Sequence, residues 1–143
     1  MGKRRRAREL ALQVLFHMEF NQGDPMESFE LVCNSFGSPD SIKAFSIQLV
    51  CGVCEKKEEL DQIISKASIN WRIERMSRVD RNILRIAVYE ILFMDDIPPK
   101  VSIDEAVELG KKYGTEESGA FVNGILDKIY LQLESKNMEG EAG

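Results

Sequence analysis

Residues 77–93 read SRVDRNILRIAVYEILF, and this stretch decides the fold. Ser77 and Asp80 stand three residues apart, which is the spacing of a capping box at a helix N-terminus. Apolar residues then follow the i, i+3, i+4, i+7 period of one helix face: Leu84, Ala87, Val88 and Ile91. A helix with this many apolar residues is expected at the centre of a bundle.

The segments on either side of this helix show the same helical period. Before it, helices are predicted over residues 3–21, from Asp24 to about 36, and from about 39 to 67. After it, a helix capped by Ser102 and Glu105 is predicted to stop at Gly114, and a last helix to open at Thr115. No alternation of Val, Ile and Thr indicates a strand. The sequence therefore predicts an all-α protein of about six to seven helices, in two three-helix bundles that share a core.

The chain is expected to form a single domain over residues 1–143. Its N-terminal helical half spans about 1–67 and its C-terminal half about 77–137, with a frayed Gly- and Glu-rich tail after about 137. Residues 68–76 break the helical pattern and contain the one tryptophan, Trp71. We interpret Trp71 as a packing residue between the halves.

Composition excludes several classes of protein. The 143 residues are 43% hydrophobic, so disorder is not expected, and no apolar stretch approaches the roughly 20 residues of a membrane span. A cytoplasmic protein without a membrane partner is predicted. Cys51 and Cys54 form a CxxC sequence with no second CxxC, which favours buried structural cysteines over a metal or redox site. No phosphate-binding glycine loop or catalytic triad signature is present, so no catalysis, cofactor or small-molecule substrate is predicted.

The first helix begins with a compact cationic run, Lys3-Arg4-Arg5-Arg6-Ala7-Arg8. Five of these six residues are positive while the chain carries −5, so the remainder of the chain sums to −10. One positive site on a negative body favours a phosphate-bearing ligand, and arginine suits phosphate through its planar fork. A solvated helix start is the alternative interpretation.

Two helix flanks combine charges with an aromatic ring. Arg5, Arg8 and Phe16 share a sector of the first helix, and Glu117, Phe121 and Lys128 share a sector of the last. Single-stranded RNA offers phosphates to the cations and base faces to the rings. Gly124 lies in the second sector, which suggests a close approach by a helix or a ligand. Arg78, Arg81 and Arg85 lie along one side of the central helix, where they pair with carboxylates or line a polar groove.

Four segments resemble the NusB transcription antitermination factors. They are Arg4–Ala11, Val79–Glu90, Ile97–Leu109 and Phe121–Lys128, in the family's order and over nearly the full chain. The resemblance implies binding of boxA-type single-stranded RNA together with the ribosomal protein NusE, and action with other Nus factors on RNA polymerase, notably at ribosomal RNA operons. It implies no reaction and no cofactor.

The resemblance also completes the candidate sites. The RNA-binding candidates are Lys3, Arg4, Arg5, Arg6, Arg8, Phe16, Arg78, Glu117, Phe121 and Lys128. The protein-partner candidates are Asp80 and Arg81. Ala120 departs from the family, since many relatives have a basic residue there.

Two alternatives remain open. One is the NusB-like regulatory domain of an RNA cytosine methyltransferase, and the other is a protein-interaction bundle whose basic helix binds an acidic partner.

Overall fold

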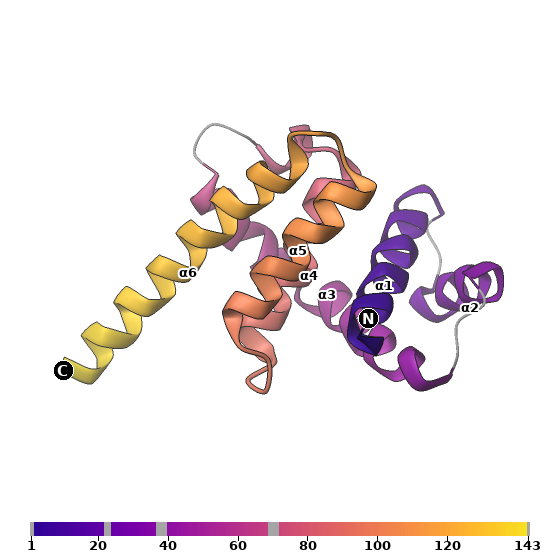
Figure 1. Ribbon diagram of the computed structural model, residues 1–143, viewed down its shortest axis with the longest axis horizontal. Helices are drawn as coiled ribbons and strands as arrows, with labels where there is room; N and C mark the ends of the chain where they lie inside the picture. The colour runs from indigo at the N-terminus through magenta and orange to yellow at the C-terminus, as the bar shows by residue number, and fades with distance from the viewer. Residues whose placement is uncertain (1, 22–23, 37–39, 69–71, 143) are drawn as a thin grey trace.

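The computed structural model describes residues 2–21, 24–36, 40–68 and 72–142, and these residues are helical with connecting turns (Figure 1). The described elements, in chain order, are α1 (Lys3–Phe20), α2 (Pro25–Phe36), α3 (Asp40–Ala67), the 3-10 helix η1 (Ile73–Arg75), α4 (Arg78–Phe93), α5 (Pro99–Tyr113) and α6 (Ser118–Ala142). The all-α class and the number of helices are confirmed. Among these described elements, no helix has both the length and the apolar character needed to cross a membrane.

Helix α4 is central, as its sequence predicts. The hydroxyl of Ser77 accepts a hydrogen bond from the Asp80 backbone N–H at 3.0 Å, which caps its first turn. The helix packs against α1, α3, α5 and α6. Its fully buried apolar residues are Ile83, Leu84, Ile86, Ala87 and Val88.

The helices bury one continuous core. Val122, Ile125, Leu126 and Ile129 of α6 are buried there, as their spacing predicts. Gly52 of α3 lies against the ring of Tyr89 on α4. A β-carbon on residue 52 would overlap this ring. This glycine therefore allows a close contact between two helices.

The two C-terminal helices begin elsewhere than predicted. Helix α5 begins at Pro99, because proline is pre-set for a first helical position. Ser102 is buried inside α5, where its hydroxyl donates to Glu90 at 2.9 Å, so it is no cap. Helix α6 begins at Ser118, whose hydroxyl accepts from the Thr115 N–H at 2.9 Å.

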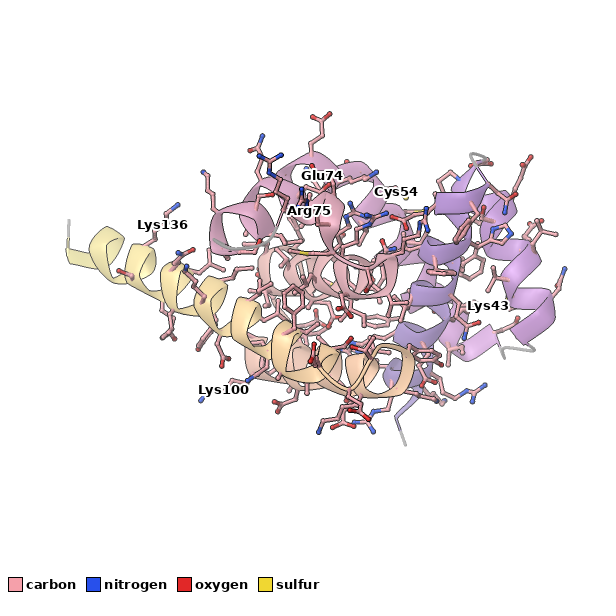
Figure 2. All side chains as sticks on the ribbon, turned by 90° about the horizontal axis from the view of Figure 1, so that it is seen from above. Lys43, Cys54, Glu74, Arg75, Lys100 and Lys136 are labelled. Atoms are coloured by element: carbon pink, nitrogen blue, oxygen red, sulfur yellow. The ribbon has the colours of Figure 1, made fainter. Side chains whose placement is uncertain are left out.

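Helix α6 crosses the body and then projects from it (Figure 1), with Lys136 on the projecting part (Figure 2). It continues to Ala142, past the point near residue 137 where the sequence predicts fraying. The role given to Trp71 lies outside the described residues. The proposed boundaries of the two halves stay a prediction.

Candidate nucleic-acid interface

The cationic run forms the first turns of α1, and three of its arginines reach carboxylates on the C-terminal half. Arg4 Nη2 lies 3.0 Å from Asp96 Oδ2, in the turn between α4 and α5. Arg5 donates to both Glu105 oxygens, at 2.8 and 3.1 Å, and this hydrogen bonding raises the Arg5 pKa. The run therefore bridges α1 to α4 and α5 as well as presenting charge.

Arg8 does not lie with the exposed arginines, which corrects its grouping with them. It is only 3% exposed, and its Nε and Nη2 donate to Glu90 at 2.8 and 2.7 Å. Glu90 is 1% exposed and also accepts from the Ser102 hydroxyl. A buried pair with both partners satisfied fixes α1 against α4 and α5, so Arg8 has a structural role here.

Lys3 and Arg6 lie exposed at the same end of α1. The Arg4 guanidinium lies 5.0 Å from the ring centroid of Phe45 on α3, a cation–π distance. The exposed part of the cationic run is therefore Lys3, Arg4 and Arg6, with Arg5 half-buried.

Phe16 lies at the far end of α1 beside an apolar groove. Its ring is 36% exposed and packs edge-on against Phe20, with the centroids 5.1 Å apart. The groove has a volume of about 810 Å³ and is lined by Leu12, Gln13, Phe16, His17, Leu31, Val32, Val79 and Tyr113. Helices α1, α2, α4 and α5 all contribute to it.

Phe121, Glu117 and Asp80 meet at a smaller pocket of about 130 Å³. Its other lining residues are Arg75, Met76, Ser77, Thr115 and Ser118. Phe121 is half-buried against the core, whereas Glu117 is exposed. Asp80 Oδ1 is buried without a hydrogen-bond partner among the described residues. The fold thus brings RNA candidates and a protein-partner candidate together.

Lys128 lies half-buried further along α6, and the intervening Gly124 faces open space. A β-carbon placed on Gly124 would have no neighbour within 4 Å. No described helix approaches the backbone there, so packing does not explain this glycine.

Arg78 and Arg81 converge on Glu19 from the start of α4. Glu19 Oε1 lies 2.9 Å from Arg81 Nη2, and Glu19 Oε2 lies 3.4 Å from Arg78 Nε. The buried Arg85 donates to both oxygens of Asp61, at 2.7 and 3.1 Å. The three arginines and Glu19 line a polar pocket of about 390 Å³. Both predicted roles are therefore present, since the arginines pair with carboxylates and line a groove.

Cys51 is exposed and Cys54 is half-buried on α3. Burial raises the pKa of the Cys54 thiol, which disfavours the thiolate. Within the described part of the chain, no three His, Cys, Asp or Glu side chains gather as metal ligands. The expectation that both cysteines are buried is wrong for Cys51, and Cys54 is buried only in part.

Sequence reasoning missed several functional candidates. Phe20 is 57% exposed, and Arg78 stacks on its ring at 4.5 Å. Leu31 is also exposed, beside the groove. Apolar residues lying off the core stripe of their helices were the available signal. The pairing of Arg5 with Glu105 has no local signal, because the two residues are far apart in the chain.

Comparison with known proteins gives one consistent result. The model of the NusB family matches residues 5–131. The chain is 51% identical over 133 residues to the transcription antitermination protein NusB of Desulfatibacillum aliphaticivorans, with 93% of each chain covered. It is 49% identical over 138 residues to that of Geobacter sulfurreducens, covering 95% of this chain and 99% of the relative.

Solved structures agree. T. maritima NusB superposes with a TM-score of 0.81 and 42% identity, over 88% of this chain and 89% of that one. A structure of the antitermination factors NusB and NusE in complex with dsRNA gives a TM-score of 0.83 and 33% identity, over 91% and 97% of the two chains. The chain belongs to the NusB family.

Proposed function

We infer that this chain is a transcription antitermination factor that binds boxA-type single-stranded RNA together with the ribosomal protein NusE. The observation that carries the inference is its similarity, over nearly the full length of both chains, to a NusB solved with NusE and dsRNA. Its curated relatives are antitermination proteins covered over almost their whole length. We further propose that it acts in the cytoplasm, together with other Nus factors on RNA polymerase at ribosomal RNA operons. Its role there is to bind RNA and proteins and not to catalyse a reaction.

The RNA surface that we propose follows the side of α1 that faces α5. The two helices run in the same direction, because Arg5 pairs with Glu105 in the middle of α5, and Glu9, one turn further along α1, pairs with Lys112 near the end of α5. Exposed cations lie at one end of this side, and the Phe121 pocket lies beyond the other. Phosphates would bind the cations while a base stacks on the ring of Phe121.

The partner surface that we propose is the apolar groove beside Phe16. Exposed apolar side chains gathered in a groove are a feature of protein interaction sites, and Phe16 and Leu31 are exposed there. Val79 lines the groove, and the next residues, Asp80 and Arg81, are the candidate partner contacts. NusE bound there would lie beside the Phe121 pocket, so one RNA strand would touch both proteins.

Binding measurements test the proposal. Fluorescence anisotropy would compare a boxA-type strand, a scrambled strand and a duplex, each with and without NusE and at two salt concentrations. We expect a preference for the boxA strand, tighter binding with NusE, and weaker binding at high salt. A protein-interaction bundle would show no sequence preference. A methyltransferase regulatory domain would bind RNA with no dependence on NusE.

A further inference from the structure

The arginines of the cationic run meet carboxylates of very different accessibility. Glu90, the partner of Arg8, is buried. The side chain of Glu105, the partner of Arg5, is 19% exposed, and that of Asp96, the partner of Arg4, is 64% exposed. Accessibility thus rises from Arg8 toward the N-terminal end of α1.

The Arg5–Glu105 pair has the geometry of an arginine bound to phosphate. Two guanidinium N–H groups, on Nε and Nη2, donate to the two carboxylate oxygens. The planar guanidinium presents the same fork to two oxygens of a phosphodiester. A carboxylate held in this way therefore occupies the position in which an RNA phosphate would bind.

We propose that Glu105 and Asp96 are internal competitors that mark two phosphate sites, and that RNA binds by replacing these carboxylates at Arg5 and Arg4. The inference rests on the RNA-binding function proposed above. The Arg8–Glu90 pair does not exchange, because both side chains are almost fully buried. Glu105 and Asp96 instead hold their arginines at a surface that an incoming strand reaches.

This exchange lowers the affinity of the cationic run for unspecific polyanions. A phosphate must displace a carboxylate that is already bound at short distance, so phosphate contacts alone give little net gain. A strand that is also held by base stacking or by NusE has binding free energy that does not depend on displacing a carboxylate. Because every polyanion meets the same displacement cost, the acidic partners of α1 weaken binding through phosphate contacts alone, and tight binding then requires base-stacking or NusE contacts as well.

The test compares two single-charge variants on α5. Glu105→Gln removes the competitor, whereas Asp104→Asn removes the same charge from the neighbouring exposed residue and serves as the matched control. With a boxA-type RNA strand at low salt, we expect Glu105→Gln to bind about two- to fivefold more tightly, the range typical of exposed ion pairs. Asp104→Asn should change affinity by less than half of that factor, through net charge alone.

A double-mutant cycle assigns the effect to Arg5. In an Arg5→Ala background, Glu105→Gln should change RNA affinity no more than Asp104→Asn does, because no arginine is released and only the net charge differs. Circular dichroism and thermal unfolding of each variant would establish that equal amounts of folded protein are compared.

Three outcomes would overturn the proposal. If Glu105→Gln and Asp104→Asn tighten RNA binding equally, the effect comes from net charge and not from release of Arg5. Weaker binding by Glu105→Gln would mean that this carboxylate orders Arg5 for RNA instead of competing. Absence of binding by the wild-type chain, with NusE present, would remove the proposed function as well, which distinguishes that failure from the first two.

Discussion

Arg5 and Arg8 lie about one helical turn apart on α1, and each donates two hydrogen bonds to a glutamate. The side chains of Arg5 and Glu105 are 39% and 19% exposed, whereas those of Arg8 and Glu90 are 4% and 1% exposed. The same arginine–glutamate pairing therefore fixes the fold at Arg8, whereas at Arg5 the glutamate is accessible to replacement by a phosphate. Distance from the core stripe of the helix, and not residue type, decides which role an arginine takes.

The largest expected effect comes from breaking the buried pair. Glu90→Ala leaves the Arg8 guanidinium buried without its acceptor, which should cost about 3–5 kcal/mol of unfolding free energy. Urea denaturation followed by circular dichroism would measure the loss. Glu105→Ala is the control, and it should cost no more than about 1 kcal/mol because its pair is partly exposed. Similar losses of unfolding free energy for Glu90→Ala and Glu105→Ala would mean that the two pairs contribute equally to the fold.

Much of the fold could be predicted from the sequence because helices have local signals, namely the period of their apolar residues and their capping residues. The period of residues 77–93 predicted a central helix, and its capping serine has the expected hydrogen bond. Helix starts were less predictable, since Ser102 has the sequence of a cap but is used to satisfy Glu90 across the core. A side chain with two possible partners takes the one that tertiary packing supplies.

The site was predicted only in outline. Helical spacing grouped Arg8 with Arg5 and Phe16, yet a few tens of degrees on the helix wheel separate a buried side chain from an exposed one. The acidic partners of the arginines come from the other half of the chain, so no local pattern indicates them. By contrast, Glu117 and Phe121 do lie together, because one element carries Phe121 and the adjoining turn carries Glu117.

Phe121 lies between the two extremes, since it is half-buried and also lines a pocket. Phe121→Ala should weaken RNA binding by about 1–3 kcal/mol through lost stacking. Its stability loss should stay below the roughly 3–5 kcal/mol of a fully buried phenylalanine. RNA titration of the folded variant and its melting curve would be read together. A large stability loss with unchanged RNA affinity per folded molecule would make Phe121 a core residue only.

The exposed end of the cationic run is expected to set the salt dependence of RNA binding. Replacing Arg4 and Arg5 together by Ala removes two phosphate contacts, and single strands lose about 0.7 of log–log salt slope for each. The slope should flatten by roughly 1.4 in anisotropy titrations across salt concentrations. Lys136→Ala, on the projecting part of α6 (Figure 2), should leave the slope unchanged. An unchanged slope in the double variant would remove α1 from the RNA surface.

The smallest expected effect concerns Glu117, which is exposed and has no arginine partner among its described contacts. It lines the Phe121 pocket, so its charge repels the phosphates of a strand stacked on that ring. Glu117→Gln should therefore tighten RNA binding by about twofold at low salt, and the gain should fade at high salt, because the screening length falls from roughly 30 Å at about 0.01 M salt to roughly 3 Å at about 1 M. Glu116→Gln removes the same charge from the neighbouring exposed residue, outside the pocket lining, and should change affinity less. Glu105 competes by contact and Glu117 only through its field, so tightening at Glu117 that persists in high salt would indicate a direct contact with RNA.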